Sequence, residues 1–91
     1  MDEHKDVILL VDDDAPITRT LERAIRCDGR LNSFTIKTAN TFAEAIAIIN
    51  TMREQIQAVV SDFNIDHGGN GVDVLTAAKN NNIAVRILYT T

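Results

Sequence analysis

Apolar residues gather in short runs along this chain, separated by segments in which they recur at helical spacing. Two runs, Val7–Val11 and residues 58–60, lack polar alternation, which is typical of strands buried on both faces of a parallel sheet. Residues 34–38 alternate apolar and polar side chains and predict an edge strand, while the apolar and β-branched residues 83–89 predict a fourth strand. The pattern therefore indicates four strands.

Three helices are expected between the strands. The first begins at Asp14 and Pro16, a capping-type acid and a proline suited to a first turn. Its apolar stripe recurs at three- and four-residue intervals and consists of Ile17, Leu21, Ala24 and Ile25. Thr41 and Glu44 have capping-box spacing at the start of the second helix. A third helical pattern begins at Gly71 and ends in a run of three asparagines.

Strands and helices alternate along all 91 residues, which predicts a single α/β domain spanning positions 1–91. Right-handed crossovers would place the helices on both faces of a parallel sheet. The carboxyl ends of the first and third strands then lie close together at one edge of the sheet. Open α/β sheets bind their ligands at this edge, so the residues that follow these two strands are candidates for a site.

Acidic residues follow both of these strands. Asp12, Asp13 and Asp14 come directly after the first strand, and Asp62 follows the third. Like charges held this close together cannot all stay ionised without a cation. Carboxylates, a backbone carbonyl and water suit Mg²⁺, so the sequence predicts a magnesium site. Asp62 is the strongest candidate for a functional residue.

Charge and composition argue against several functions. Nine basic against 13 acidic residues give a net charge of −4, which argues against direct nucleic-acid binding. The single Cys27 cannot form an internal disulfide and fits a reducing compartment. The charged first six residues lack the apolar core of a signal peptide, and no apolar stretch approaches membrane-spanning length. We therefore expect a cytoplasmic protein with no membrane partner.

Around the two acidic strand ends, the sequence resembles a response-regulator receiver domain, the phosphoacceptor module of two-component signalling. Asp12 and Asp13 resemble the acidic pair that follows the family's first strand. Asp62 lies in a Ser-Asp-Phe-Asn stretch that resembles the phosphoacceptor turn, and Thr90 falls where the family has Ser or Thr. The resemblance implies a flavodoxin-like, doubly wound parallel sheet with strand order 2-1-3-4.

The resemblance also implies a function. Asp62 would accept a phosphoryl group from a sensor histidine kinase. Mg²⁺ would be held by Asp13, Asp62 and the backbone carbonyl of Asn64, with Asp12 behind them or acting through water. Thr90 would donate a hydrogen bond to the transferred phosphoryl group. Such a protein takes up phosphate on itself and is not expected to be an enzyme with an external substrate.

The sequence departs from the family pattern after the fourth strand. The family's fourth helix, fifth strand and fifth helix are missing, and with them an aromatic residue on the fifth strand and the lysine that follows it. None of the three lysines is placed to replace that lysine; they are Lys5, Lys37 and Lys79. The fourth strand should therefore be an unpaired edge beside uncovered apolar surface. A homodimer formed through this edge, or a longer parent protein, would cover it.

Other interpretations stay open at this point. The chain could be a degenerate or truncated receiver that works as a protein-interaction or dimerisation module without being phosphorylated. Asp12, Asp13 and Asp14 also resemble the start of haloacid-dehalogenase-type phosphatases, although Pro16 and the short chain disagree with that family.

Several residues have simpler interpretations as well. Asp62 alone could be a turn-former, Asp14 is read as a helix cap rather than a metal ligand, and Thr90 could be an ordinary strand residue. His4 and His67 are interpreted as solvated, because one histidine beside hard oxygen ligands does not define a zinc site.

Overall fold

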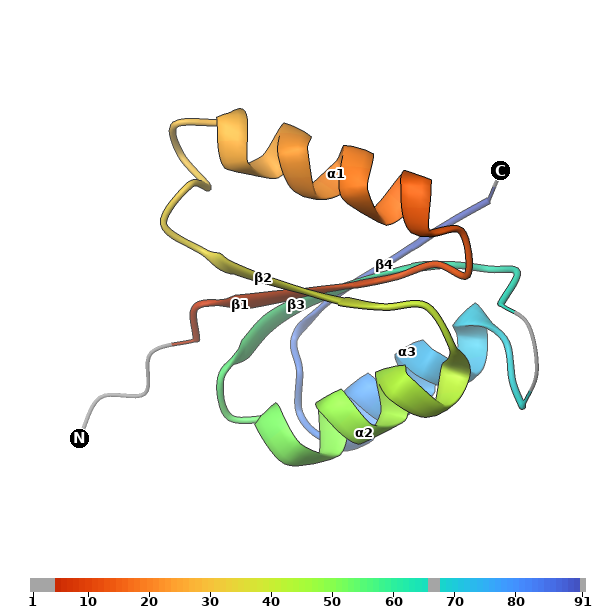
Figure 1. Ribbon diagram of the computed structural model, residues 1–91. Coiled ribbons are helices and arrows are strands. Elements are labelled where there is room, and N and C mark those ends of the chain that lie inside the picture. Colours follow the sequence, from red (N-terminus) through yellow and green to blue (C-terminus); the bar gives the residue numbers. More distant parts are fainter. Residues whose placement is uncertain (1–4, 66–67, 91) are drawn as a thin grey trace.

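The structure is a computed structural model that describes residues 5–65 and 68–90. Along these residues strands and helices alternate as β1 (Val7–Val11), α1 (Ala15–Cys27), β2 (Thr35–Ala39), α2 (Phe42–Met52), β3 (Ile56–Asp62), α3 (Gly71–Asn80) and β4 (Val85–Tyr89) (Figure 1). No other helix or strand lies within the described ranges. In that part of the chain, no helix combines the length and the apolar character that crossing a bilayer requires.

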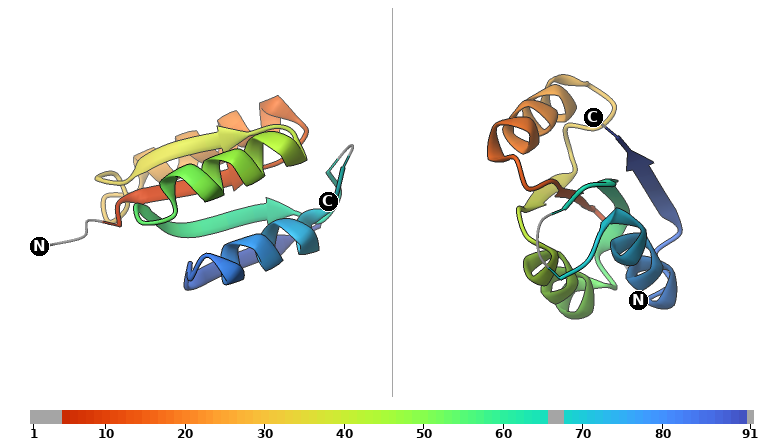
Figure 2. Two further views of the ribbon diagram at one scale, coloured as in Figure 1. Left: turned by 90° about the horizontal axis from the view of Figure 1, so that it is seen from below. Right: turned by 90° about the vertical axis from the view of Figure 1, so that its right-hand side faces the viewer.

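The four strands form one parallel sheet in the order β2-β1-β3-β4. Helix α1 covers one face of this sheet, and α2 and α3 cover the other (Figures 1 and 2). The predicted α/β class, strand order and flavodoxin-like architecture are therefore confirmed. Because β1 and β3 lie in the middle of the sheet, their carboxyl ends are neighbours, as the sequence predicts.

The core consists of two layers, one on each face of the sheet. Leu9, Val11 and Val59 are fully buried on the face that α2 and α3 cover. Leu10 and its neighbour Ile8 are buried on the opposite face, which α1 covers. Both faces of the central strands are thus sealed, which explains why their sequences are continuously apolar.

The boundaries of β2, β3 and β4 differ from the sequence prediction by one or two residues, and β3 extends from Ile56 to Asp62. Phe34 does not belong to β2, because its N–H donates to the Leu31 carbonyl in a turn at 3.1 Å. Strand β4 begins at Val85 rather than at Ile83. The N–H of Ile83 donates to the Ala78 carbonyl at 3.0 Å, so that residue still belongs to the exit from α3.

The first two helices begin where the sequence predicts, but their capping hydrogen bonds differ from the predicted ones. Asp14 occupies the N-cap of α1, yet its side chain accepts no capping hydrogen bond. At α2, the Thr41 hydroxyl accepts from the Glu44 N–H at 3.1 Å, as predicted. The Glu44 carboxylate accepts from the N–H of Asn40 at 2.8 Å, one residue earlier than the capping box requires.

A complete capping box lies at the start of α3, where the sequence analysis did not predict one. The Asn70 side chain accepts from the Asp73 N–H, and the Asp73 carboxylate accepts from the Asn70 N–H, both at 3.1 Å. This reciprocal pair fixes the point at which the loop after β3 becomes helix.

Gly71, the first residue of α3, packs directly against the end of β3. A Cβ atom at this position would lie 2.3 Å from the Asp62 carbonyl oxygen and 2.8 Å from the Cα of Phe63. The Gly71 N–H also donates to the Phe63 carbonyl at 2.9 Å. Only a residue without a side chain allows α3 to approach the strand this closely.

We expect the substitution Gly71→Ala to destabilise the chain by about 1–3 kcal/mol, because the new methyl group overlaps backbone atoms that cannot move aside cheaply. Gly29→Ala is the matched control, since a Cβ there meets nothing within 4 Å. Chemical denaturation of both variants measures the difference. Equal stabilities for the two variants would show that α3 does not pack on β3 in this way.

Candidate functional site

Side-chain alternation places two acids on the same face of the sheet. Leu10 points toward α1, and Asp12 follows it two residues later. Val60 packs in the same layer, and Asp62 follows it by the same interval. Because side chains in a strand repeat with period two, Asp12 and Asp62 both emerge at the carboxyl edge on the side of α1.

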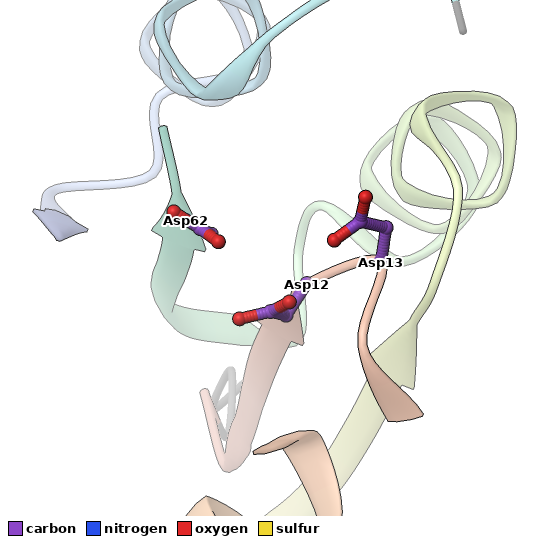
Figure 3. A group of neighbouring side chains, drawn as sticks. All are labelled: Asp12, Asp13 and Asp62. Atoms are coloured by element: carbon purple, nitrogen blue, oxygen red, sulfur yellow. The ribbon is translucent and has the colours of Figure 1, made fainter. Parts of the chain in front are cut away.

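The structure brings three predicted metal ligands together. One carboxylate oxygen from each of Asp12, Asp13 and Asp62 lies within 4.8 Å of the other two. Figure 3 shows Asp12 at the end of β1, Asp62 at the end of β3, and Asp13 in the turn that follows β1, with their carboxylates facing a common space. Asp12 and Asp62 are buried, with exposed fractions of 1% and 3%, whereas Asp13 is exposed.

Hydrogen bonds hold the turn after β1 in place. The Asp12 Oδ1 atom accepts from the N–H of Asp14 at 2.9 Å, so Asp14 serves this turn through its backbone. The Asn40 side chain, at the end of β2, donates through Nδ2 to the Asp12 carbonyl oxygen at 2.8 Å. Asn40 therefore supports the position of Asp12, a role that the sequence analysis missed.

The other predicted site residues lie at the same edge. Asn64 is exposed and donates its backbone N–H to the Asp62 Oδ1 atom at 3.2 Å. Thr90 is exposed and directly follows β4, whose last residue pairs with Asp62. Within the described part of the chain, its hydroxyl makes no hydrogen bond to Asp12 or Asp62. His4 and His67 lie outside the described residues.

Tyr89, which sequence analysis treated only as a strand residue, reaches the acids from β4. Its hydroxyl donates to the Asp12 Oδ2 atom at 2.5 Å. Burial raises the pKa of the Tyr89 hydroxyl above its usual value, and the hydrogen bond to Asp12 and the negative charges of the three acids act in the same direction. Tyr89 pairs with Asp62 in the register of the sheet, so the two side chains share a face. That register is the signal by which Tyr89 could have been found.

The lysine side chains belong to segments away from the acids. Lys5 precedes β1 at the opposite end of the sheet, Lys37 lies in the middle of β2, and Lys79 lies in the last turn of α3. All three lysines of the chain are described, and none is placed among the acids. The donor set is therefore made of hard carboxylate oxygens, which fits a divalent cation such as Mg²⁺.

No protein-family model matches the sequence, and neither does any curated protein. Solved structures match its fold. The MaeR response regulator bound to beryllium trifluoride is 28% identical, with a TM-score of 0.74 over 93% of this chain. A response-regulator receiver domain protein from Clostridium thermocellum is 24% identical, with a TM-score of 0.79 over 92% of this chain. The HemR receiver domain from Leptospira biflexa is 24% identical, with a TM-score of 0.75 over 94% of this chain.

This chain has the fold of a response-regulator receiver domain. It spans about two thirds of the length of those solved chains, from 64% to 66%. The receiver elements that the described residues contain end at β4, as the sequence analysis expected.

The three carboxylates at this edge of the sheet repel one another in the absence of a cation. We expect Asp62→Asn, in the presence of a chelator, to raise the free energy of unfolding by about 1 kcal/mol or more, because it removes one of three charges at close range. Denaturant unfolding at neutral pH checks this. Asp6→Asn is the control, since that exposed acid precedes β1 at the opposite end of the sheet. An Asp62→Asn variant less stable than the control would contradict the repulsion.

Proposed function

We propose that this chain is a phosphoacceptor receiver that takes a phosphoryl group from a histidine kinase on Asp62. The observation that carries the proposal is the group of three carboxylates within 4.8 Å of one another at the carboxyl edge of a receiver fold. Asp62 belongs to that group and ends the central strand β3, so its carboxylate is held on a rigid element. Asp62 is buried, and its Oδ1 atom accepts from the Asn64 N–H, which holds the carboxylate beside Asp12 and Asp13.

The transfer itself is a nucleophilic displacement at phosphorus. A carboxylate oxygen of Asp62 forms the new O–P bond while the P–N bond of the phosphohistidine breaks. The imidazole nitrogen keeps the electron pair of the broken bond, and the product is an aspartyl-phosphate. One phosphoryl group is taken up per chain, so the protein acts as an acceptor of phosphate rather than as an enzyme with an external substrate.

Mg²⁺ fits the donor set and would be held by Asp13, Asp62 and the backbone carbonyl of Asn64. When bound, the ion would neutralise negative charge on the phosphoryl oxygens. Asp12 already accepts hydrogen bonds on both carboxylate oxygens, so we assign it to contact the ion through water. Thr90 would donate a hydrogen bond to the phosphoryl group, since it follows the residue that pairs with Asp62.

The probe of choice is a small phosphodonor, because it needs no cognate kinase. We expect incubation with acetyl phosphate and Mg²⁺ to add one phosphoryl group per chain, measured by intact mass. The Asp62→Asn variant should add none, and the Asp6→Asn control should behave as the unmodified chain. Beryllium trifluoride, which is bound in the MaeR structure, should shift backbone amide signals around Asp62 and Thr90 in the presence of Mg²⁺.

Two outcomes would contradict the phosphoacceptor. The absence of both phosphorylation and a beryllium trifluoride response would favour a non-phosphorylated interaction module. Sustained turnover of a chromogenic phosphate ester would instead favour a phosphatase of the haloacid-dehalogenase type.

A second candidate function is self-association through β4, and the exposure of that strand favours it. Among the described strands β4 pairs with β3 alone, so its outer backbone groups have no partner strand. Val85 and Ile87 are exposed by 38% and 49% on the face where α1 lies, and Leu88 is exposed by 39% on the other face. An open edge with apolar side chains is a common site of strand addition.

We therefore expect the apparent mass in light scattering to rise with protein concentration. Ile87→Lys should lower this association, because a charge would have to be buried in the interface. Val72→Lys is the matched control, since Val72 has a similar exposed fraction of 47% but lies on α3. A mass that stays monomeric at every concentration would rule out the dimer.

A further inference from the structure

Tyr89 is the one residue of β4 that is not exposed, and its hydroxyl contacts Asp12, one of the three acids. The backbone of Tyr89 is tied to β3, because its carbonyl accepts from the Phe63 N–H at 2.7 Å. From this anchored position the ring reaches across the end of β3 to Asp12, at the end of β1. The contact therefore joins an edge strand to the central acid of the site.

The contact completes the hydrogen bonding of the Asp12 carboxylate. Oδ1 accepts from the Asp14 N–H at 2.9 Å, and Oδ2 accepts from the Tyr89 hydroxyl at 2.5 Å. One oxygen is thus held by the main chain and the other by a side chain. With both oxygens held, the carboxylate plane cannot rotate away from Asp13 and Asp62, although repulsion between like charges favours that rotation.

We propose that Tyr89 is a positioning residue of the metal site formed by Asp12, Asp13 and Asp62. Its hydroxyl holds Asp12 in the orientation that Mg²⁺ binding requires. This inference rests on the proposed function, because it assumes that the three acids bind Mg²⁺. Groups that orient the residues around a metal ion commonly change metal affinity by a factor of about 10 when they are removed, and Tyr89 would act in this way through Asp12 and its water. A neutral donor suits this place, since it fixes the carboxylate without adding a positive charge that would compete with the ion.

A purely structural role for Tyr89 makes a different prediction. If the hydroxyl only anchored the end of β4, its loss would lower stability equally with and without Mg²⁺. If it positions Asp12, its loss reduces the stabilisation that Mg²⁺ adds. The difference between the two conditions, rather than stability itself, is therefore the measurement that separates the roles.

The test is Mg²⁺ titration of the whole chain by calorimetry, together with denaturant unfolding in Mg²⁺ and in chelator. We expect Tyr89→Phe, which keeps the ring, to weaken Mg²⁺ binding about tenfold. In an Asp12→Asn background the same substitution should cause no further loss, because the two groups act as a unit. Val72→Ala is the control, since it shortens an exposed side chain on α3, outside both the acids and β4, and should leave Mg²⁺ binding unchanged.

The unmodified chain provides an independent signal. Tyr89 is its only tyrosine and it contains no tryptophan, so tyrosine fluorescence reports on this one ring. We expect Mg²⁺ to change that fluorescence with the same midpoint as the calorimetric titration.

The outcomes separate this inference from the function on which it rests. If the unmodified chain binds Mg²⁺ and Tyr89→Phe binds it equally well or more tightly, the positioning role is overturned and the phosphoacceptor stands. A chain that binds no Mg²⁺ at all overturns both. Weaker binding in Tyr89→Phe that persists unchanged in the Asp12→Asn background also overturns the role, because the effect would not pass through Asp12.

Discussion

The fold of this molecule holds three carboxylates together against their mutual repulsion. Asp12, Asp13 and Asp62 lie within 4.8 Å of one another, and two of them are almost fully buried. Nothing local favours such an arrangement, since each acid would be better solvated apart from the others. The parallel pairing of β1 with β3 imposes it, because that pairing is fixed by a core that cannot shift register without exposing Leu9 and Val59.

That constraint explains the polar contacts that surround the acids. Asn40 holds the backbone of Asp12, the Asp14 N–H holds one of its oxygens, and Tyr89 holds the other. These groups come from the residue after β2, the end of β4 and the turn after β1, so three separate segments contribute to the position of Asp12. The fold thus supplies a rigid frame around a group of charges that would otherwise move apart.

Much of the fold was predictable from local pattern. Continuous apolar runs predicted the central strands, because residues sealed on both faces leave no polar alternation. The acidic strand ends were also visible, since Asp12 follows β1 and β3 ends in Asp62. Contacts between strands were harder to see. Tyr89 and Asn40 look like ordinary strand and loop residues, and their roles depend on which side chains share a face across the sheet. That depends on register, which a single segment does not reveal.

The approach of Gly71 to the end of β3 has a mechanical consequence. Gly71 places no side chain of its own between the first turn of α3 and the peptide group of Asp62, and the Gly71 N–H donates to the Phe63 carbonyl. A strand end and a helix in such contact have no compliant layer between them. A displacement of the backbone at Phe63 would therefore move the first turn of α3 with it, because the two backbones are in direct contact.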